Sequence, residues 1–227
     1  MQEMQESRGG YHPGYPLFLD MRNRRVVVIG AGKVAERKVD TLLSYGADIA
    51  VISPEATPCI RRWADDSLVS LEERAYREGD LAGASIVFCA CGDPAVEEQV
   101  YAESHCEGCL ANVVDVPPLC DFIVPSIVER GPLRIAVSTS GTAPTEAKTI
   151  RHRLEARFDA SWAPYLELMG EVRSLVKDRI PGADSVRRPI YEAAGSAGWR
   201  ERLAAGESIS AEKAYREAVA AASKEAC

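Results

Sequence analysis

The sequence has no run of about 18 or more apolar residues, the length that a membrane-spanning helix needs. It also contains no internal repeats and no low-complexity block. Hydrophobic residues make up 46% of the chain and charged residues 27%, which is ordinary for a globular protein. We therefore expect no membrane partner, and 227 residues allow one good core plus a smaller second unit.

The sequence has fewer positively charged than negatively charged residues. The chain has 27 Lys and Arg against 34 Asp and Glu, which gives a net charge of −7. This balance argues against nucleic acid as a partner, because nucleic-acid binding depends on clustered cations. An anionic ligand would have to be held by local basic groups against an unfavourable overall field.

The first 14 residues lack the apolar stretch of a secretory signal peptide, and we expect residues 1–14 to form a disordered tail. The seven cysteines are an odd number, scattered through apolar stretches and loops. These features predict free thiols in a reducing, cytoplasmic protein. Cys106 and Cys109, preceded by His105, have zinc-knuckle spacing, but no second pair follows, so we predict no metal site.

The stretch around which the chain is organised covers residues 25–38. Four β-branched residues run into Gly30, a turn follows, and helical periodicity begins after Gly32. Gly30 permits a tight turn, and Gly32 has no side chain to keep a pyrophosphate from the backbone. A second strand at 48–53 completes the βαβ context that dinucleotide binding requires, although a simple packing turn is the alternative. The predicted NAD contacts are Gly30, Ala31, Gly32, Lys33 and Val34.

The end of the second predicted strand is where such domains offer Asp or Glu to the ribose hydroxyls. Here the sequence reads Ser53-Pro54-Glu55. Glu55 can serve this purpose if the loop curls back. We therefore predict NAD as the cofactor, with Ser53, Pro54 and Glu55 beside it.

Strands and helices alternate through residue 115, with further strands at 85–90 and 110–115 and a helix from Pro94 to Ser104. This order predicts an α/β fold with a Rossmann-like parallel sheet over residues 15–115. Residues 116–143 are β-rich, and strand follows strand through Gly131-Pro132, which predicts a hairpin-like or meander arrangement. The exposed edges of these strands suggest a dimerisation segment and a homodimer. From residue 144 to 227 the pattern predicts a helical domain.

Asp115 is the predicted catalytic residue. It follows an apolar strand and precedes the Pro117-Pro118 loop, at the strand end where open α/β sheets bind ligands. Partial burial would raise the pKa of this carboxyl toward that of a useful base. Turn capping, a common role for Asp before a proline-containing loop, is the alternative.

A second glycine turn, rich in hydroxyl groups, precedes the helix predicted from Pro144. It can bind a phosphate or a carboxylate through its N–H groups and hydroxyls. An ordinary helix cap made by Thr142 explains the same residues equally well. The predicted substrate contacts are Ser138, Thr139, Ser140, Gly141 and Thr142. Basic residues that could dock a polycarboxylate are Arg130, Arg134, Lys148, Arg151, Arg153 and Arg157.

Five segments in a fixed order carry a family resemblance: 30–38, 112–115, 120–126, 130–133 and 136–144. The chain resembles the precorrin-2 dehydrogenases, the module of siroheme synthases that oxidises precorrin-2 to sirohydrochlorin with NAD. The resemblance implies a Rossmann domain, a central dimerisation segment and a helical domain. It also implies Asp115 as the catalytic residue, cofactor contacts at Lys33-Val34 and Pro54-Glu55, and Thr139 near the tetrapyrrole.

The chain departs from the family in one loop. Where the family usually reads Ala-Thr-Asp, this sequence has Ala90-Cys91-Gly92, so the family's cofactor contacts in that loop are not carried over to this sequence. Two alternatives to a simple dehydrogenase remain. One is a bifunctional enzyme that also inserts iron, since some family members use the same cavity and Asp for this. The other is a non-catalytic, NAD-sensing Rossmann module.

Overall fold

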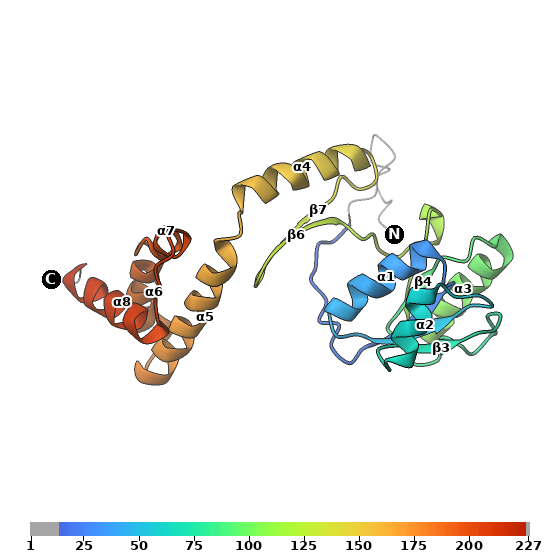
Figure 1. The fold of residues 1–227 in the computed structure, drawn as a ribbon, viewed down its shortest axis with the longest axis horizontal. Coiled ribbons are helices and arrows are strands. Elements are labelled where there is room, and N and C mark those ends of the chain that lie inside the picture. The colour runs from blue at the N-terminus through green and yellow to red at the C-terminus, as the bar shows by residue number, and fades with distance from the viewer. Residues whose placement is uncertain (1–13, 226–227) are drawn as a thin grey trace, which may run out of the picture. The chain divides into compact units, whose positions relative to one another are not determined.

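The structure is a computed structural model, and it describes residues 14–225. The predicted disordered tail at 1–14 therefore lies almost entirely outside the described residues. The chain divides into two compact units, with the boundary between Val124 and Pro125 (Figure 1). Among residues 14–225, no helix is both long and apolar enough to cross a membrane.

The first unit is built on a parallel sheet of five strands in the order β3-β2-β1-β4-β5. The order reverses between β1 and β4, which makes this the topological switch point where α/β sheets bind ligands. The predicted α/β fold with a Rossmann-like sheet is thereby confirmed. The strands are β1 (Arg25–Ile29), β2 (Asp48–Ile52), β3 (Ser70–Glu72), β4 (Ile86–Cys89) and β5 (Leu110–Val113).

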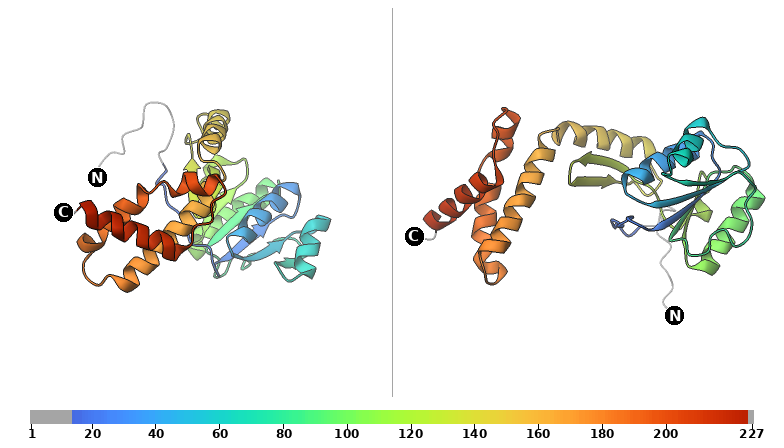
Figure 2. Two further views of the ribbon diagram at one scale, coloured as in Figure 1. Left: turned by 60° about the vertical axis from the view of Figure 1, so that its left-hand side comes forward. Right: turned by 60° about the horizontal axis from the view of Figure 1, so that its bottom comes forward.

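Helices cover both faces of this sheet (Figure 2). Alternate residues of β1 enter different cores, because successive side chains of a strand point to opposite faces. Val26 and Val28 pack in the core that contains Val39 of α1, whereas Val27 and Ile29 pack in the core that contains Val100 of α3. Burial on both faces explains why β1, β2 and β4 are continuous apolar runs. The helices are α1 (Lys33–Ser44), α2 (Pro58–Asp65) and α3 (Pro94–Glu107).

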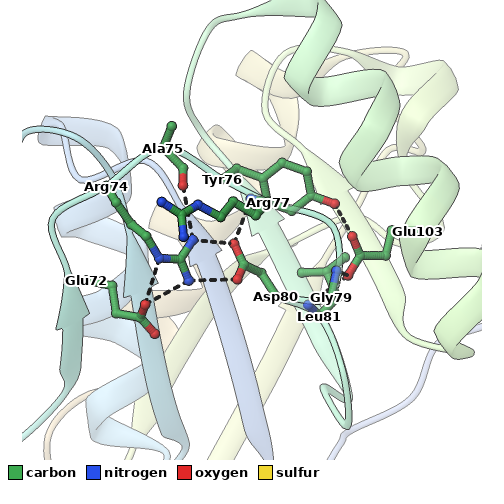
Figure 3. A network of polar contacts seen from close by, with 9 residues as sticks. All are labelled: Glu72, Arg74, Ala75, Tyr76, Arg77, Gly79, Asp80, Leu81 and Glu103. Carbon is green, nitrogen blue, oxygen red and sulfur yellow. Dashed lines mark hydrogen bonds and ion pairs between the residues drawn. The ribbon is translucent and has the colours of Figure 1, made fainter.

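The connection from β3 to β4 is irregular but is held by ion pairs (Figure 3). Arg74 donates to both carboxylate oxygens of Asp80, at 2.8 and 2.7 Å, and its Nε lies 2.8 Å from Glu72 Oε2. Asp80 also accepts from the backbone N–H of Arg77 at 2.8 Å. The guanidinium lowers the pKa of the Asp80 carboxyl against the opposing effect of burial, the largest single influence on that group.

Glu103 on α3 fastens the other side of the same connection (Figure 3). Its carboxylate accepts from the backbone N–H groups of Gly79 at 3.1 Å and Leu81 at 2.9 Å, and from the Tyr76 hydroxyl. Burial, together with this carboxylate, raises the pKa of Tyr76. The loop is therefore positioned on α3 by side-chain bonds, which allows Leu81 to be fully buried in the core.

The second unit begins with an antiparallel hairpin of β6 (Ser126–Arg130) and β7 (Leu133–Val137), which turns at Gly131-Pro132. This confirms the hairpin that the sequence predicts. Helices follow to the end of the described chain, as expected. Their core surrounds Trp199, which is fully buried, and includes Val172, Val176 and Ala218. The helices are α4 (Pro144–Arg157), α5 (Trp162–Arg179), α6 (Asp184–Gly195), α7 (Trp199–Ala204) and α8 (Ala211–Glu225).

Candidate cofactor and catalytic site

Gly30 is required by the fold itself. It adopts φ +100°, a conformation that L side chains rarely adopt. A Cβ at this position would lie 2.5 Å from the carbonyl oxygen of Ala90, which is backbone and cannot turn away. The N–H of Gly30 donates to the Ile52 carbonyl at 2.8 Å, so the turn is tied to the end of β2. Any other residue would push β1 away from the loop after β4.

Gly32 is different, because nothing in the protein demands a glycine there. Its φ of −78° suits any residue, and no atom lies within 4 Å of the place a Cβ would occupy. It is the N-cap of α1 and provides no side-chain cap for the first N–H groups of that helix. Open space over uncapped N–H groups is what a pyrophosphate needs. The residues at this turn therefore fit a dinucleotide.

Lys33 and Val34 form the first turn of α1, where the sequence predicts cofactor contacts. The Lys33 ammonium is largely exposed and lies 3.0 Å from the Glu36 carboxylate. A hydrogen bond from Thr57 and this ammonium both lower the pKa of Glu36. Thr57 also caps α2, and its N–H donates to the Ala31 carbonyl at 3.1 Å. The glycine turn and the loop after β2 are thus joined by several bonds.

Residues 53–55 form a turn that is closed by a side-chain hydrogen bond. Ser53 is buried at the end of β2, and its hydroxyl donates to the Glu55 carbonyl at 2.8 Å. Pro54 and Glu55 are exposed. The structure therefore brings this loop to the same edge of the sheet as Gly30, although the role of each residue stays a prediction.

Asp115 lies beyond the end of β5, in a turn, with φ +63°. Its side chain is exposed, so the expectation that the Asp115 carboxyl is partly buried is wrong. The reason is that β5 stops at Val113, two residues early, and the chain turns outward. Cys120 supports this turn, because its thiol donates to the Val113 carbonyl at 3.1 Å. The catalytic role of Asp115 remains a prediction that rests on position, without the argument from burial.

Lys38 is a residue of this region to which the sequence analysis assigns no role. It is half-buried on α1, with its Nζ 5.5 Å above the centre of the Phe88 ring. Burial lowers the pKa of this ammonium, as does the charge of Arg37, while Asp115 and Cys120 act in the opposite direction. A cation thus acts on the Asp115 carboxylate within the first unit. The one sequence signal for Lys38 is its position in segment 30–38, which is among the segments that carry the family resemblance.

The hydroxyl-rich turn lies in the second unit, and its hydroxyls bond mainly to their own backbone. Ser138 Oγ accepts from Ser140 N at 3.0 Å, Thr139 Oγ1 accepts from Ala143 N at 3.2 Å, and Thr142 donates to the Thr139 carbonyl at 2.6 Å. The alternative explanation of this turn, a helix cap made by Thr142, is wrong, because the N-cap residue of α4 is Ala143, which makes no side-chain capping bond, and Pro144 follows at the first position. Gly141 adopts φ +80°.

The group around Cys106 lies at the amino end of β5, opposite the edge that carries Asp115. His105 Nε2 lies 3.3 Å from the Asp121 carboxylate, Cys106 is exposed, and Cys109 is buried. Burial raises the pKa of the Cys109 thiol to about 11, which disfavours the thiolate that a metal needs. Within residues 14–225, no group of three or more His, Cys, Asp or Glu side chains is arranged to hold a metal ion.

The sheet order, the turn at its switch point and the open N-terminus of α1 define a dinucleotide-binding α/β domain. Residues 17–126 match the family described as putative NAD(P)-binding, and residues 130–157 match the family described as sirohaem biosynthesis protein, central. These two segments are therefore similar to those families, and the chain resembles siroheme synthases over most of its own length.

The similarity extends well beyond these two segments. The chain is 35% identical to a siroheme synthase of Nitrosococcus oceani over 204 residues, 90% of this chain and 43% of the relative. It is 36% identical to one of a Psychrobacter species, over 89% of this chain and 42% of the relative. It thus spans less than half the length of these relatives. A solved structure of SirC, a precorrin-2 dehydrogenase, matches with a TM-score of 0.75 and 26% identity, covering 93% of this chain and 100% of that one.

Proposed function

We propose that the chain catalyses the NAD-dependent oxidation of precorrin-2 to sirohydrochlorin in siroheme biosynthesis. The observation that carries the proposal is the likeness to a precorrin-2 dehydrogenase over the whole of that protein's length. The open space over Gly32, at the uncapped N-terminus of α1, supports it independently, because a pyrophosphate can approach the backbone there. Matches to siroheme synthases fit the same pathway.

The cofactor, NAD+, supplies the hydride acceptor when it is bound. The chain's own residues bind and orient it. The turn at Gly30 to Gly32 and the first N–H groups of α1 hold the pyrophosphate. Glu55 accepts hydrogen bonds from the ribose hydroxyls, and its negative charge would repel the additional phosphate of NADP. We therefore propose NAD as the preferred cofactor.

Asp115 holds or relays the proton that leaves the macrocycle during the oxidation. Its exposure allows a substrate to reach it, and the Lys38 ammonium of α1 interacts with it electrostatically. The carboxylates of precorrin-2 would bind at residues 138–142, with nearby cations. Arg151 and Arg134 already pair with Glu155 and Glu129. The basic residues of α4 that are left for this purpose are Lys148, Arg153 and Arg157.

We further propose that the protein is a homodimer through the hairpin of β6 and β7. Only Val128 of the hairpin is buried, while Ile127, Ile135 and Val137 remain partly exposed. A two-stranded sheet with open edges and apolar side chains favours pairing with another chain. Light scattering at micromolar concentration should give twice 24.6 kDa, and a mass of 24.6 kDa would contradict the dimer.

The experiment that tests the function is anaerobic incubation of the full chain with precorrin-2 and NAD+, read by absorption. Sirohydrochlorin should form with NAD+ and more slowly with NADP+. Fe²⁺ added afterwards tests the bifunctional alternative, since siroheme would appear only if the chain also inserts iron. Bound NAD without any oxidation of precorrin-2 would favour the NAD-sensing alternative.

A further inference from the structure

Two cysteine thiols lie together at the end of β4. The sulfurs of Cys89 and Cys91 are 3.5 Å apart. Cys89 is fully buried in the core beneath the sheet, and Cys91 is exposed. The pair therefore joins a sulfur that solutes can reach to one that they cannot.

The residue between them touches the glycine turn. Ala90 donates its N–H to the Ile29 carbonyl at 2.8 Å, and its own carbonyl oxygen occupies the space beside Gly30 that a Cβ would need. β4 is the neighbour of β1 at the switch point, so Cys91 stands at the edge where a dinucleotide binds. A shift of the backbone at Ala90 would therefore displace the glycine turn at which we propose that the pyrophosphate binds.

We propose that Cys89 and Cys91 close reversibly into a disulfide, and that this disulfide weakens cofactor binding at the adjacent glycine turn. The second half of this inference rests on the proposed NAD-dependent function, whereas the first half does not. The oxidant would be a peroxide, and the expected product is an intrachain disulfide that spans one residue.

Closure requires movement, and the structure indicates which part moves. The two sulfurs must approach from 3.5 Å to the bond length of about 2.05 Å. Cys89 is fixed by the strand, since it pairs with Ile29 on one side and Val113 on the other. The adjustment therefore falls on Cys91 and on the peptide units of Ala90. Because the Ala90 carbonyl already abuts Gly30, its displacement would distort or obstruct the turn.

The chemistry takes two steps and balances. The Cys91 sulfur attacks hydrogen peroxide, which breaks the O–O bond and gives a sulfenic acid and water. The Cys89 sulfur then attacks the Cys91 sulfur and forms the S–S bond, and the sulfenic hydroxyl leaves with the Cys89 proton as a second water. Two thiols thus lose two electrons in total, and the peroxide gains them.

The order of the two steps follows from the environment of each thiol. Cys91 is reached first because it is exposed, whereas Cys89 is enclosed by the strands. Burial raises the pKa of the Cys89 thiol, and the neighbouring Cys91 raises it further, so Cys89 is a poor first nucleophile. It acts instead as the resolving thiol. A disulfide that spans one residue and exposes its Cys91 sulfur is of the labile kind that cellular dithiols reduce.

The test uses the full chain, treated with hydrogen peroxide after complete reduction. Remaining thiols are alkylated, and peptide masses then locate any disulfide. NAD affinity is measured by calorimetry before oxidation, after oxidation and after addition of dithiothreitol. We expect a disulfide between Cys89 and Cys91, a loss of NAD affinity of about tenfold or more, which corresponds to at least about 1.4 kcal/mol, and recovery on reduction.

Matched variants separate this pair from the other thiols. In Cys91→Ser, peroxide should leave the NAD affinity of that variant unchanged, because no disulfide can form. In Cys89→Ala, Cys91 should proceed to sulfinic acid, and dithiothreitol should not restore the lost affinity. Cys106→Ser, at an exposed thiol near the end of α3, should respond to peroxide as the wild type does.

Three results would overturn the proposal. They are the absence of a disulfide between Cys89 and Cys91, a disulfide that joins two copies of the chain through Cys91, and a disulfide that forms without changing NAD affinity. If the reduced protein fails to bind NAD at all, the proposed function fails and the coupling to cofactor binding falls with it. The thiol pair is then still judged by the peptide masses and by whether oxidation shifts the melting temperature.

Discussion

At the scale of single residues, two glycines of one turn serve different purposes. Gly30 is required by its φ of +100° and by the Ala90 carbonyl beside it. Gly32 has an ordinary backbone conformation and empty space where a side chain would be. The sequence motif does not distinguish them, because both positions simply read Gly. The structure separates a glycine that the turn requires from one whose backbone would accept any residue, and a cofactor contact at the second glycine stays a prediction.

This distinction predicts opposite behaviour for two variants. Gly32→Asp should fold with an almost unchanged melting temperature but lose NAD affinity by about 100-fold or more, because a carboxylate would face the pyrophosphate. Gly30→Ala, its matched control, should lose about 2 kcal/mol or more of folding stability. Calorimetry and urea unfolding measure the two effects. Unchanged NAD affinity in Gly32→Asp would refute the phosphate cradle.

Asp115→Asn is the sharpest test of the proposed base. Asn tolerates the φ of +63° found at this position, so the turn should survive the change. The amide cannot accept the proton, and the rate of precorrin-2 oxidation should fall by about 100-fold or more while NAD affinity is retained. Single-turnover kinetics measures the rate. Near-normal turnover of precorrin-2 by Asp115→Asn would contradict a catalytic role of Asp115 and favour the alternative that it only forms the turn.

At the scale of elements, the Glu103 carboxylate holds one side of the connection between β3 and β4. Removing Glu103 would leave the N–H groups of Gly79 and Leu81 and the Tyr76 hydroxyl without their acceptor. Glu103→Ala should therefore reduce the free energy of unfolding by about 2 to 3 kcal/mol. Glu98→Ala, an exposed position on the same helix, is the control and should change it little. Equal stabilities of the two variants in urea would contradict this view of the loop.

The helical unit contains a cluster that responds to acid. Arg202 donates to Glu207 at 2.8 Å and Lys213 does so at 2.9 Å, and these bonds lower the pKa of Glu207 from 4.5 to about 2. The pKa of Glu207 is thus lower in the folded state than in the unfolded state. Its bonds with Arg202 and Lys213 therefore stabilise the protein above pH 4.5, and this contribution is lost as the pH falls toward 2.

When the pH is lowered from about 5 to about 3, the melting temperature of Glu207→Gln should accordingly fall less than that of the wild type. Glu171→Gln on α5, an exposed position outside the cluster, makes the same change of charge and should follow the wild type. Thermal unfolding at a series of pH values measures both. A wild-type pH dependence in Glu207→Gln would show that the cluster does not act as described.

Elements with strong periodicity could be predicted from the sequence, and features that depend on tertiary contacts could not. Alternation and apolar runs indicate β1, β2 and β4, and Gly131-Pro132 indicates the hairpin turn. The exposure of Asp115 follows from where β5 stops, which depends on bonds from Cys120 and is invisible in the local sequence. A cap of α4 by Thr142 was one of two explanations for its turn, but the Thr142 hydroxyl bonds to the Thr139 carbonyl instead, a competition that residue preferences alone do not resolve.

At the scale of the whole molecule, the resemblance stated from five sequence segments is confirmed by the matches to siroheme synthases and to SirC. The fold class is confirmed as well. The individual site residues, the homodimer and the boundaries of the three segments remain predictions. The chain spans 43% of the relative from Nitrosococcus oceani, so the activity of this chain has to be measured on this chain.

The most direct measurement follows NADH and sirohydrochlorin together in one anaerobic reaction of the full chain with precorrin-2 and NAD+. The account predicts that the two products form in equal amounts, that Gly32→Asp forms neither at moderate NAD+ concentration, and that Asp115→Asn forms both slowly. Sirohydrochlorin formed at the same rate without NAD+, or by Gly32→Asp as fast as by the wild type, would contradict it.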